Sequence, residues 1–212
     1  LAPIGIAFAA VILGGYAMLP AIFLAAAASA LLNGSPLFYA LIGAIANTVQ
    51  PALGAYILEK TGFDRALSRV KDMFLMLVIA LFVTMIVPTT NALSMFFYEA
   101  HYRTASIVHW SNWWVGGALS ALVLTPFLIR WIHFRMTPRR PGKFTESVVT
   151  VGIVAVLSAL VFGTTYTSIG GLSLLFPLML ALAWIAIRVG PRFMTLALFL
   201  MTVFSMWGAV YG

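Results

Sequence analysis

Two amide side chains and two glycines form a polar stripe inside an apolar stretch of the chain, residues 37–60. At about 100° per residue they fall within one arc of about 60° on a helix: Gly43, Asn47, Gln50 and Gly54. Polar groups are costly in hydrocarbon, so each needs a partner or a purpose. The stripe is therefore predicted to face protein or a cavity, with Leu41, Ile45 and Tyr56 on the opposite side of the helix.

A proline in the same stretch adds a main-chain group to this stripe. Pro51 has no N–H to donate to the carbonyl of Asn47, so that carbonyl is freed near the middle of the membrane. A freed carbonyl beside the amides of Asn47 and Gln50 can bind a ligand, and Pro51 is a candidate hinge. The alternative is that these groups only hydrogen-bond neighbouring helices.

Tryptophans mark the start of a second apolar stretch, about residues 110–134. Three of them stand close together: Trp110, Trp113 and Trp114. Such a group at a membrane interface is first of all an aromatic belt. Trp113 also shares one helical face with Gly117 and Ser120, and Pro126 is a second candidate hinge.

The acidic residues, histidines and cysteines predict no catalytic or metal site and no cofactor in this segment. All five carboxylates are expected at span ends or in loops, so no buried pair is available for acid–base catalysis. The absence of cysteine excludes disulfides and thiolate chemistry. His101 and His109 share one loop with Glu99, where a metal or pH-sensing cluster is conceivable. We interpret that loop as solvated.

The composition is that of a membrane protein. Hydrophobic residues make up 63% of the chain and charged residues 8%, which excludes an ordinary soluble domain. The net charge of +7 does not indicate nucleic-acid binding, because the basic residues cluster at the ends of apolar segments. The expected partner is the lipid bilayer, including its anionic headgroups.

The apolar segments predict an all-α, polytopic helical bundle with about eight membrane segments. Their approximate bounds are 3–18, 19–32, 37–60, 73–87, 110–134, 147–162, 172–187 and 191–211. The first two are short, so a helical pair that does not fully cross stays open as an alternative. Pro88 is expected to end the fourth segment, with a short helix at 91–98. The connector 61–72 is expected to form a short interfacial helix.

Basic residues fix the orientation of these segments. Eleven of the twelve Lys and Arg residues lie in or beside loops of one parity, and the loops 60–71, 135–146 and 188–192 are therefore predicted to be cytoplasmic. Alternation then places residues 1 and 212 outside. We accordingly expect at least one further span after residue 212 in the parent protein.

An ordered set of short motifs resembles a known family over nearly the whole chain. The motifs are Ala-Pro3-Ile-Gly, Asn33-Gly34, Ala-Asn47-Thr48-Val-Gln-Pro, Phe63-Asp64, Trp113-Trp114-Val-Gly-Gly, Thr-Pro126-Phe, Phe-Pro177-Leu and Arg188-Val-Gly190-Pro. Together they resemble the first class of bacterial membrane-associated sensor domain, in the MASE family. The positions that match the family's motifs include Asn47, Thr48, Trp113 and Trp114. The chain departs from the family where Gly116-Gly117 replaces Gly-Asp, which removes an intramembrane acid.

The resemblance implies a sensory input domain over residues 1–212, in the bacterial inner membrane. In the family such a domain is coupled to a cytoplasmic output module, which is a diguanylate cyclase (GGDEF), with or without EAL, or a histidine kinase. No such module lies in this segment, so the segment itself is not an enzyme. GTP and Mg would belong to that absent module. We expect a homo-oligomer that receives a small-molecule or protein signal.

The ligand-binding candidates are Asn47, Thr48, Gln50, Trp113 and Trp114, and the hinge candidates are Pro51 and Pro126. Two rival functions stay open. Kinked helices with amides at mid-membrane also suit a small-solute transporter or its substrate-binding subunit. Glycine-rich helix faces also suit a scaffold that binds another membrane protein.

Overall fold

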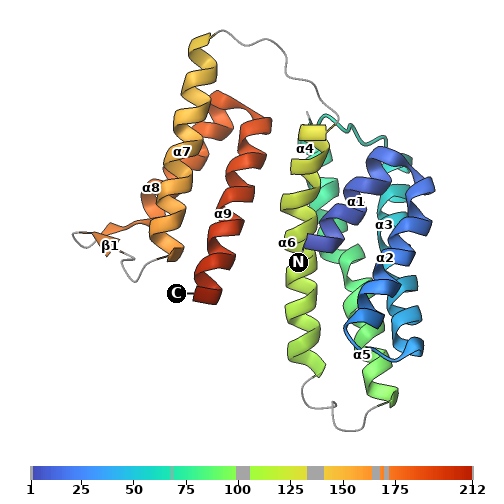
Figure 1. Ribbon diagram of the computed structural model, residues 1–212. Helices are drawn as coiled ribbons and strands as arrows, with labels where there is room; N and C mark the ends of the chain where they lie inside the picture. Colours follow the sequence, from blue (N-terminus) through green and yellow to red (C-terminus); the bar gives the residue numbers. More distant parts are fainter. Residues whose placement is uncertain are drawn as a thin grey trace. The chain divides into compact units, whose positions relative to one another are not determined.

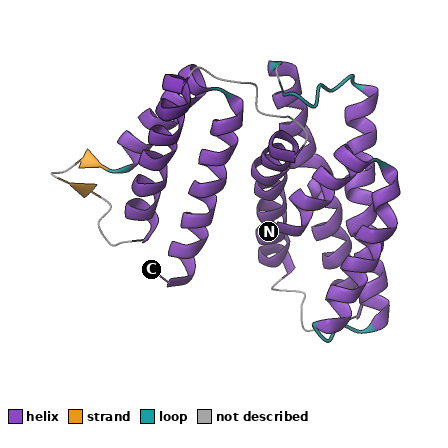
Figure 2. Cartoon of the chain, turned by 45° about the horizontal axis from the view of Figure 1, so that its top comes forward, coloured by secondary structure: helices purple, strands orange, loops and turns teal. Residues whose placement is uncertain are grey.

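The computed structural model describes residues 2–67, 69–98, 106–132, 141–163, 168–169 and 172–211. Its architecture is all-α, as predicted, with one small hairpin (Figures 1 and 2). The helices of the first part are α1 (Ala2–Gly14), α2 (Leu19–Leu32), α3 (Leu37–Lys60), α4 (Val70–Phe82), α5 (Ile86–Tyr98) and α6 (Ser106–Ile132). Short 3-10 turns, η1 (Tyr16–Met18) and η2 (Val83–Met85), join α1 to α2 and α4 to α5.

The remaining helices are α7 (Pro141–Gly163), α8 (Leu175–Trp184) and α9 (Pro191–Tyr211), with a π-helical turn η4 (Ile185–Val189) after α8. Strands β1 (Ser168–Ile169) and β2 (Leu172–Ser173) pair antiparallel, with Ile169 opposite Leu172. Gly190, at φ 102°, turns the chain between η4 and α9, and Pro191 starts the next helix, where its missing N–H costs nothing.

Eight apolar helical segments lie within the described ranges. Five are long and apolar enough to cross a membrane: Leu37–Lys60, Val70–Met95, Val108–Ile132, Phe144–Gly163 and Pro191–Ala209. Three are shorter: Pro3–Gly14, Tyr16–Leu32 and Leu175–Val189. This agrees with the predicted number of segments and with the short lengths of the first two.

The chain divides into two compact units, residues 1–129 and 130–212. In the first unit, α1, α2 and α5 all pack against α3. Figure 1 shows the α3–α4 connector at one end of this unit, and the α2–α3 turn with the end of α5 at the other. In the second unit, α7 packs against α8 and α9. Its apolar core includes Val154, Leu178, Ile185 and Ala197.

The predicted orientation of α3 is confirmed. Gln50 and Gly54 are buried, whereas Leu41, Ile45 and Tyr56 are 41%, 54% and 51% exposed. Gly54 is required by packing, because a Cβ there would lie 2.2 Å from Cε1 of the buried Phe8. The glycine thus lets α1 approach α3 closely.

Three predicted boundaries are corrected. Pro88 does not end the fourth span: it lies in the first turn of α5, where a proline needs no helical partner, and α4, η2 and α5 form one bent segment. The connector has turns at residues 61–67 rather than an interfacial helix, and α4 already begins at Val70. The helix α7 begins at Pro141, inside the predicted loop 135–146.

Candidate functional site

Two side chains from other helices bond main-chain groups on either side of the break between α4 and α5. The 3-10 turn η2 interrupts the regular pairing of each N–H with the carbonyl four residues earlier. The Gln50 Oε1 atom on α3 accepts the N–H of Val87 at 3.2 Å. The Trp114 indole on α6 donates to the carbonyl of Leu81 at 2.8 Å. Gln50 and Trp114 therefore brace the break, and we call this pair the kink brace.

The kink brace sets these two residues apart from the other ligand-binding candidates. Gln50 is only 1% exposed, and a ligand that used its carboxamide oxygen would have to replace the bond to Val87. Thr48 is also occupied, because its hydroxyl donates to the carbonyl of Ala44 at 2.7 Å within α3. The fold therefore uses the Gln50 oxygen, the Trp114 indole N–H and the Thr48 hydroxyl hydrogen.

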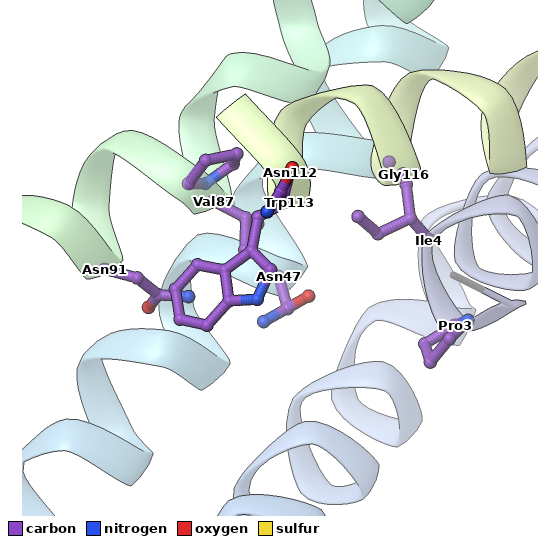
Figure 3. Close-up of a pocket in the computed structure, with 10 residues that line it drawn as sticks. Pro3, Ile4, Asn47, Val87, Asn91, Asn112, Trp113 and Gly116 are labelled. Carbon is purple, nitrogen blue, oxygen red and sulfur yellow. The ribbon is translucent and has the colours of Figure 1, made fainter. Parts of the chain in front are cut away.

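Asn47 and Trp113 lie in a different setting, at the boundary of two hollows in the first unit. The first hollow, about 290 Å³, is lined by α1, α5 and α6, and the second, about 300 Å³, reaches Ser35 and Pro36 in the α2–α3 turn. Three side chains line both: Asn47, Asn91 and Trp113. Figure 3 shows them together, and we call them the amide site.

The amide site offers hydrogen-bonding atoms that the fold leaves unused. Asn47 donates through Nδ2 to the carbonyl of Gly43 at 2.8 Å, and its side chain lines both hollows. Among the described residues, neither the Asn91 carboxamide nor the Trp113 indole makes a hydrogen bond. Gly43 lines the second hollow, and a Cβ there would make only an ordinary van der Waals contact with Asn91 Oδ1, at 3.8 Å. No acidic or basic side chain is among the described residues that line either hollow.

The N-terminal helix supplies one wall of the first hollow. The N–H of Gly5 donates to Ser120 Oγ at 2.9 Å, and Thr125 Oγ1 donates to the Gly5 carbonyl at 3.0 Å. These bonds clamp α1 to α6 and place Pro3 and Ile4 beside the amide site (Figure 3). The close crossing needs glycine at position 5, because a Cβ there would meet the backbone oxygen of Ser120, whereas a Cβ on Gly117 would meet only the end of the Ile4 side chain, at 2.9 Å.

The three tryptophans near the start of α6 differ in role, and Trp114 belongs to the kink brace. Trp110 stacks on Trp114 at 5.5 Å between ring centroids and donates to Thr89 Oγ1 at 3.0 Å. Trp113 is 42% exposed and lines both hollows. The sequence could not separate these roles, which depend on the neighbouring α4 and α5.

The hinge candidates lie inside continuous helices. Pro51 is buried within α3, and Pro126 is partly buried within α6. The break between α4 and α5 at η2 has no proline of its own and precedes Pro88. Sequence reasoning missed this break and missed Asn91, although Pro88 was a local signal for an irregular backbone.

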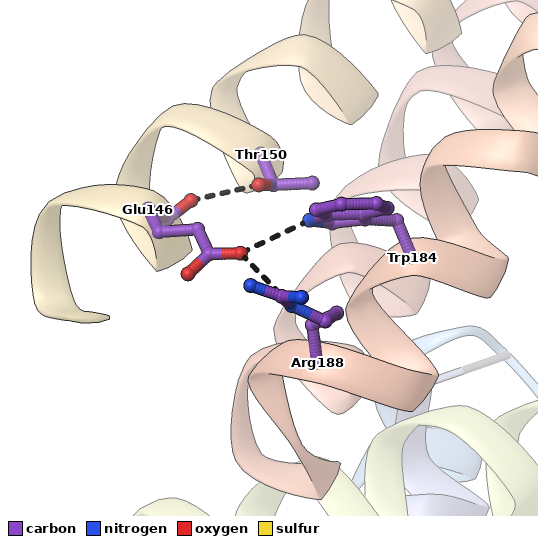
Figure 4. A network of polar contacts seen from close by, with 4 residues as sticks. All are labelled: Glu146, Thr150, Trp184 and Arg188. Atoms are coloured by element: carbon purple, nitrogen blue, oxygen red, sulfur yellow. Dashed lines mark hydrogen bonds and ion pairs between the residues drawn. The ribbon is translucent and has the colours of Figure 1, made fainter.

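Two charged clusters lie away from the amide site. Asp72 lies in the first turn of α4, at a span end as predicted, and is fully buried. It accepts the Asp64 N–H at 3.1 Å, and its second oxygen has no partner in the described part of the chain. In the second unit, Glu146 accepts from the Trp184 indole at 3.2 Å and lies 3.7 Å from Arg188 Nε (Figure 4). Neither cluster forms a metal site, since no described residues form a group of three or more acidic, His or Cys ligands.

Several predicted features lie outside the described residues. Glu99 and His101 lie outside them, so the geometry of the metal or pH-sensing cluster considered for Glu99, His101 and His109 is not described. Residues 133–140 of the second basic loop lie outside them as well.

The fold and the amide site define a multi-pass, all-α membrane protein with an uncharged polar hollow between its helices. The chain belongs to the MASE1 family, a family of membrane-associated sensor domains, whose sequence model matches residues 1–212. The resemblance drawn from the ordered motifs is thereby confirmed. No curated protein and no solved structure matches the chain.

Proposed function

We propose that this chain is the input domain of a bacterial inner-membrane signalling protein, and that a signal received at the amide site is passed to a cytoplasmic output module. Family membership supports the sensory role. The proposed output is a diguanylate cyclase, with or without a phosphodiesterase module, or a histidine kinase. The basic residues support a cytoplasmic position for the loop 60–71, and the second hollow reaches the α2–α3 turn at the opposite end of the unit. The signal is therefore proposed to enter from the outer side.

One observation carries the proposal: the helices that form the amide site also form the kink brace. On α3, Asn47 lies one turn before Gln50, and on α6, Trp113 directly precedes Trp114. A ligand that shifts α3 against α6 therefore changes how the α4–α5 break is bonded. Such a ligand drives the change only if it binds the two arrangements unequally.

The helix α6 continues from this site past the boundary of the two units. It carries Trp113 in the first unit and Trp131 in the second, and it is a single helix between them. The Arg192 guanidinium lies over the Trp131 ring at 4.5 Å, and Phe193 meets the same ring edge-on. Both contacts lie inside the second unit, at the end of α6.

The output of the full-length parent protein tests this function. Asn47→Leu should abolish its response to growth conditions, measured as cellular cyclic-di-GMP or as autophosphorylation according to the output module. Val49→Leu is the matched control, because this side chain lies on the same helix and is 47% exposed. A normal response in Asn47→Leu, at wild-type membrane expression, would contradict the proposal. The expected homo-oligomer stays a prediction, which crosslinking of the parent protein in native membranes checks.

A further inference from the structure

We infer that the amide site selects a small, uncharged ligand that carries both a hydrogen-bond donor and an acceptor on a flat apolar body, such as an aromatic carboxamide. This inference rests on the proposed sensory function and names the chemical class of its signal. It follows from the charge, the hydrogen-bonding atoms, the ring and the size of the site.

The lining of the hollows selects against charge. The residues that surround the amide site are apolar, aromatic, amide or hydroxyl residues, and no described lining residue is acidic or basic. An ion that entered would lose its hydration without gaining a counter-charge, which is strongly unfavourable in a low-dielectric site. A carboxylate or an ammonium group on the ligand is therefore excluded.

The amides require a ligand with both kinds of hydrogen-bonding atom. Each asparagine carries a carbonyl acceptor and an NH2 donor. One Asn47 donor is used by Gly43, whereas Asn91 makes no hydrogen bond among the described residues. A carboxamide on the ligand can accept from one asparagine and donate to the other. A ligand that lacks these atoms leaves the amides unpaired, which is the usual source of sharp selectivity.

Trp113 and the cavity volumes define the body of the ligand. Its indole borders both hollows and stays 42% exposed, so it can stack on a flat ring. The hollows, at about 290 and 300 Å³, lie at the lower end of the range of roughly 300–1,000 Å³ for small-molecule sites. A molecule of one or two rings fits this space.

The kink brace can be compared with the amide site, because the two have similar side chains but different hydrogen bonding. Gln50 and Trp114 carry the same side-chain groups as the amide site, a carboxamide and an indole. They lie on α3 and α6, the helices that also carry Asn47 and Trp113. The Gln50 carboxamide oxygen is bonded to the Val87 N–H, and the Trp114 indole N–H to the Leu81 carbonyl. The ligand atoms therefore face Asn47, Asn91 and Trp113 rather than Gln50 and Trp114.

Benzamide and benzoate test the inference directly, because they have the same size and ring and differ in the amide and the charge. Binding of each radiolabelled compound is measured by equilibrium dialysis on the full-length parent protein in lipid nanodiscs, with empty nanodiscs as the baseline for partitioning. Benzamide should bind saturably, and benzoate at least about tenfold more weakly. Asn47→Leu and Asn91→Leu should each weaken benzamide binding about tenfold, whereas the exposed Leu93→Ala on α5 should not.

Equal binding of the two compounds, or benzamide uptake that matches empty nanodiscs, would overturn the ligand class. So would benzamide binding that survives both asparagine substitutions in variants that elute as wild type on size-exclusion chromatography. A different result would contradict the sensory function alone. In that case benzamide binds as predicted, but Asn47→Leu leaves the output response of the parent protein intact.

Discussion

Loss of the Gln50 carboxamide should loosen the α4–α5 break by a predictable amount. Gln50→Leu keeps most of the side-chain volume and removes the oxygen that accepts the Val87 N–H. Val87 is 7% exposed, so its N–H would be left without solvent. An unsatisfied buried donor costs about 1–3 kcal/mol, and interhelical hydrogen bonds in membranes reach about 1.7 kcal/mol. We therefore expect a cost of about 1–2 kcal/mol.

This cost corresponds to a roughly 5–30-fold increase in local opening at the break. Amide hydrogen exchange of the segment 83–87, measured by mass spectrometry on the full-length parent protein in nanodiscs, should accelerate by that factor. Val49→Leu, on the exposed side of α3, should leave the same peptides unchanged. Trp114→Phe removes the bond to Leu81 and should accelerate the same segment. The double variant should show less than the sum of the two effects, because both bonds serve one break.

Unchanged exchange of residues 83–87 in Gln50→Leu would refute this reasoning. It would mean that the Val87 N–H finds another partner and that α3 does not hold the break. Acceleration spread evenly over all helices would also count against it, since the brace acts at one place.

Two further substitutions test the packing around the hollows and the connector. Gly5→Ala places a Cβ 2.4 Å from the Ser120 carbonyl oxygen and should destabilise the protein by about 1–3 kcal/mol in thermal unfolding, whereas Gly152→Ala, with open space around it, should not. If both alanine variants melt alike, the α1–α6 crossing is not tight. Asp72→Leu leaves the Asp64 N–H without its acceptor and should cost about 1–3 kcal/mol, while Asp72→Asn keeps an acceptor oxygen and should cost less. Equal losses for the two Asp72 variants would assign the effect to charge rather than to the hydrogen bond.

The spans and the buried face of α3 could be predicted because both follow from periodicity and the cost of polar groups in lipid. The α4–α5 break could not. Pro88 predicts an end to a helix locally, but bonds from Gln50 and Trp114, distant in sequence, allow the chain to continue as α5. The burial of Asp72 could not be predicted for the same kind of reason, because it depends on how the connector folds back onto the start of α4.

The candidate site was predicted in part. Asn47 and Trp113 were named from helical periodicity and from family motifs, and both line the two hollows. Asn91 was missed, because its role depends on the packing of α5 beside α3 and α6. The departure at Gly117, where the family pattern has an acid, also has a structural counterpart: this glycine lines the first hollow and is crossed closely by Ile4. The site is consequently uncharged.

Chemical filling of the amide site tests the central claim most directly. The 212 residues contain no cysteine, so Asn91→Cys introduces a thiol that a small neutral methanethiosulfonate can modify within the hollows. Leu93→Cys on the same helix, 52% exposed, is the matched control, and the reagent is also applied to the unsubstituted parent protein. Modification of Asn91→Cys should hold the output of the full-length protein in one state, with the Leu93→Cys output unchanged. Identical output before and after complete modification of Asn91→Cys would contradict the claim that occupancy of this site controls signalling.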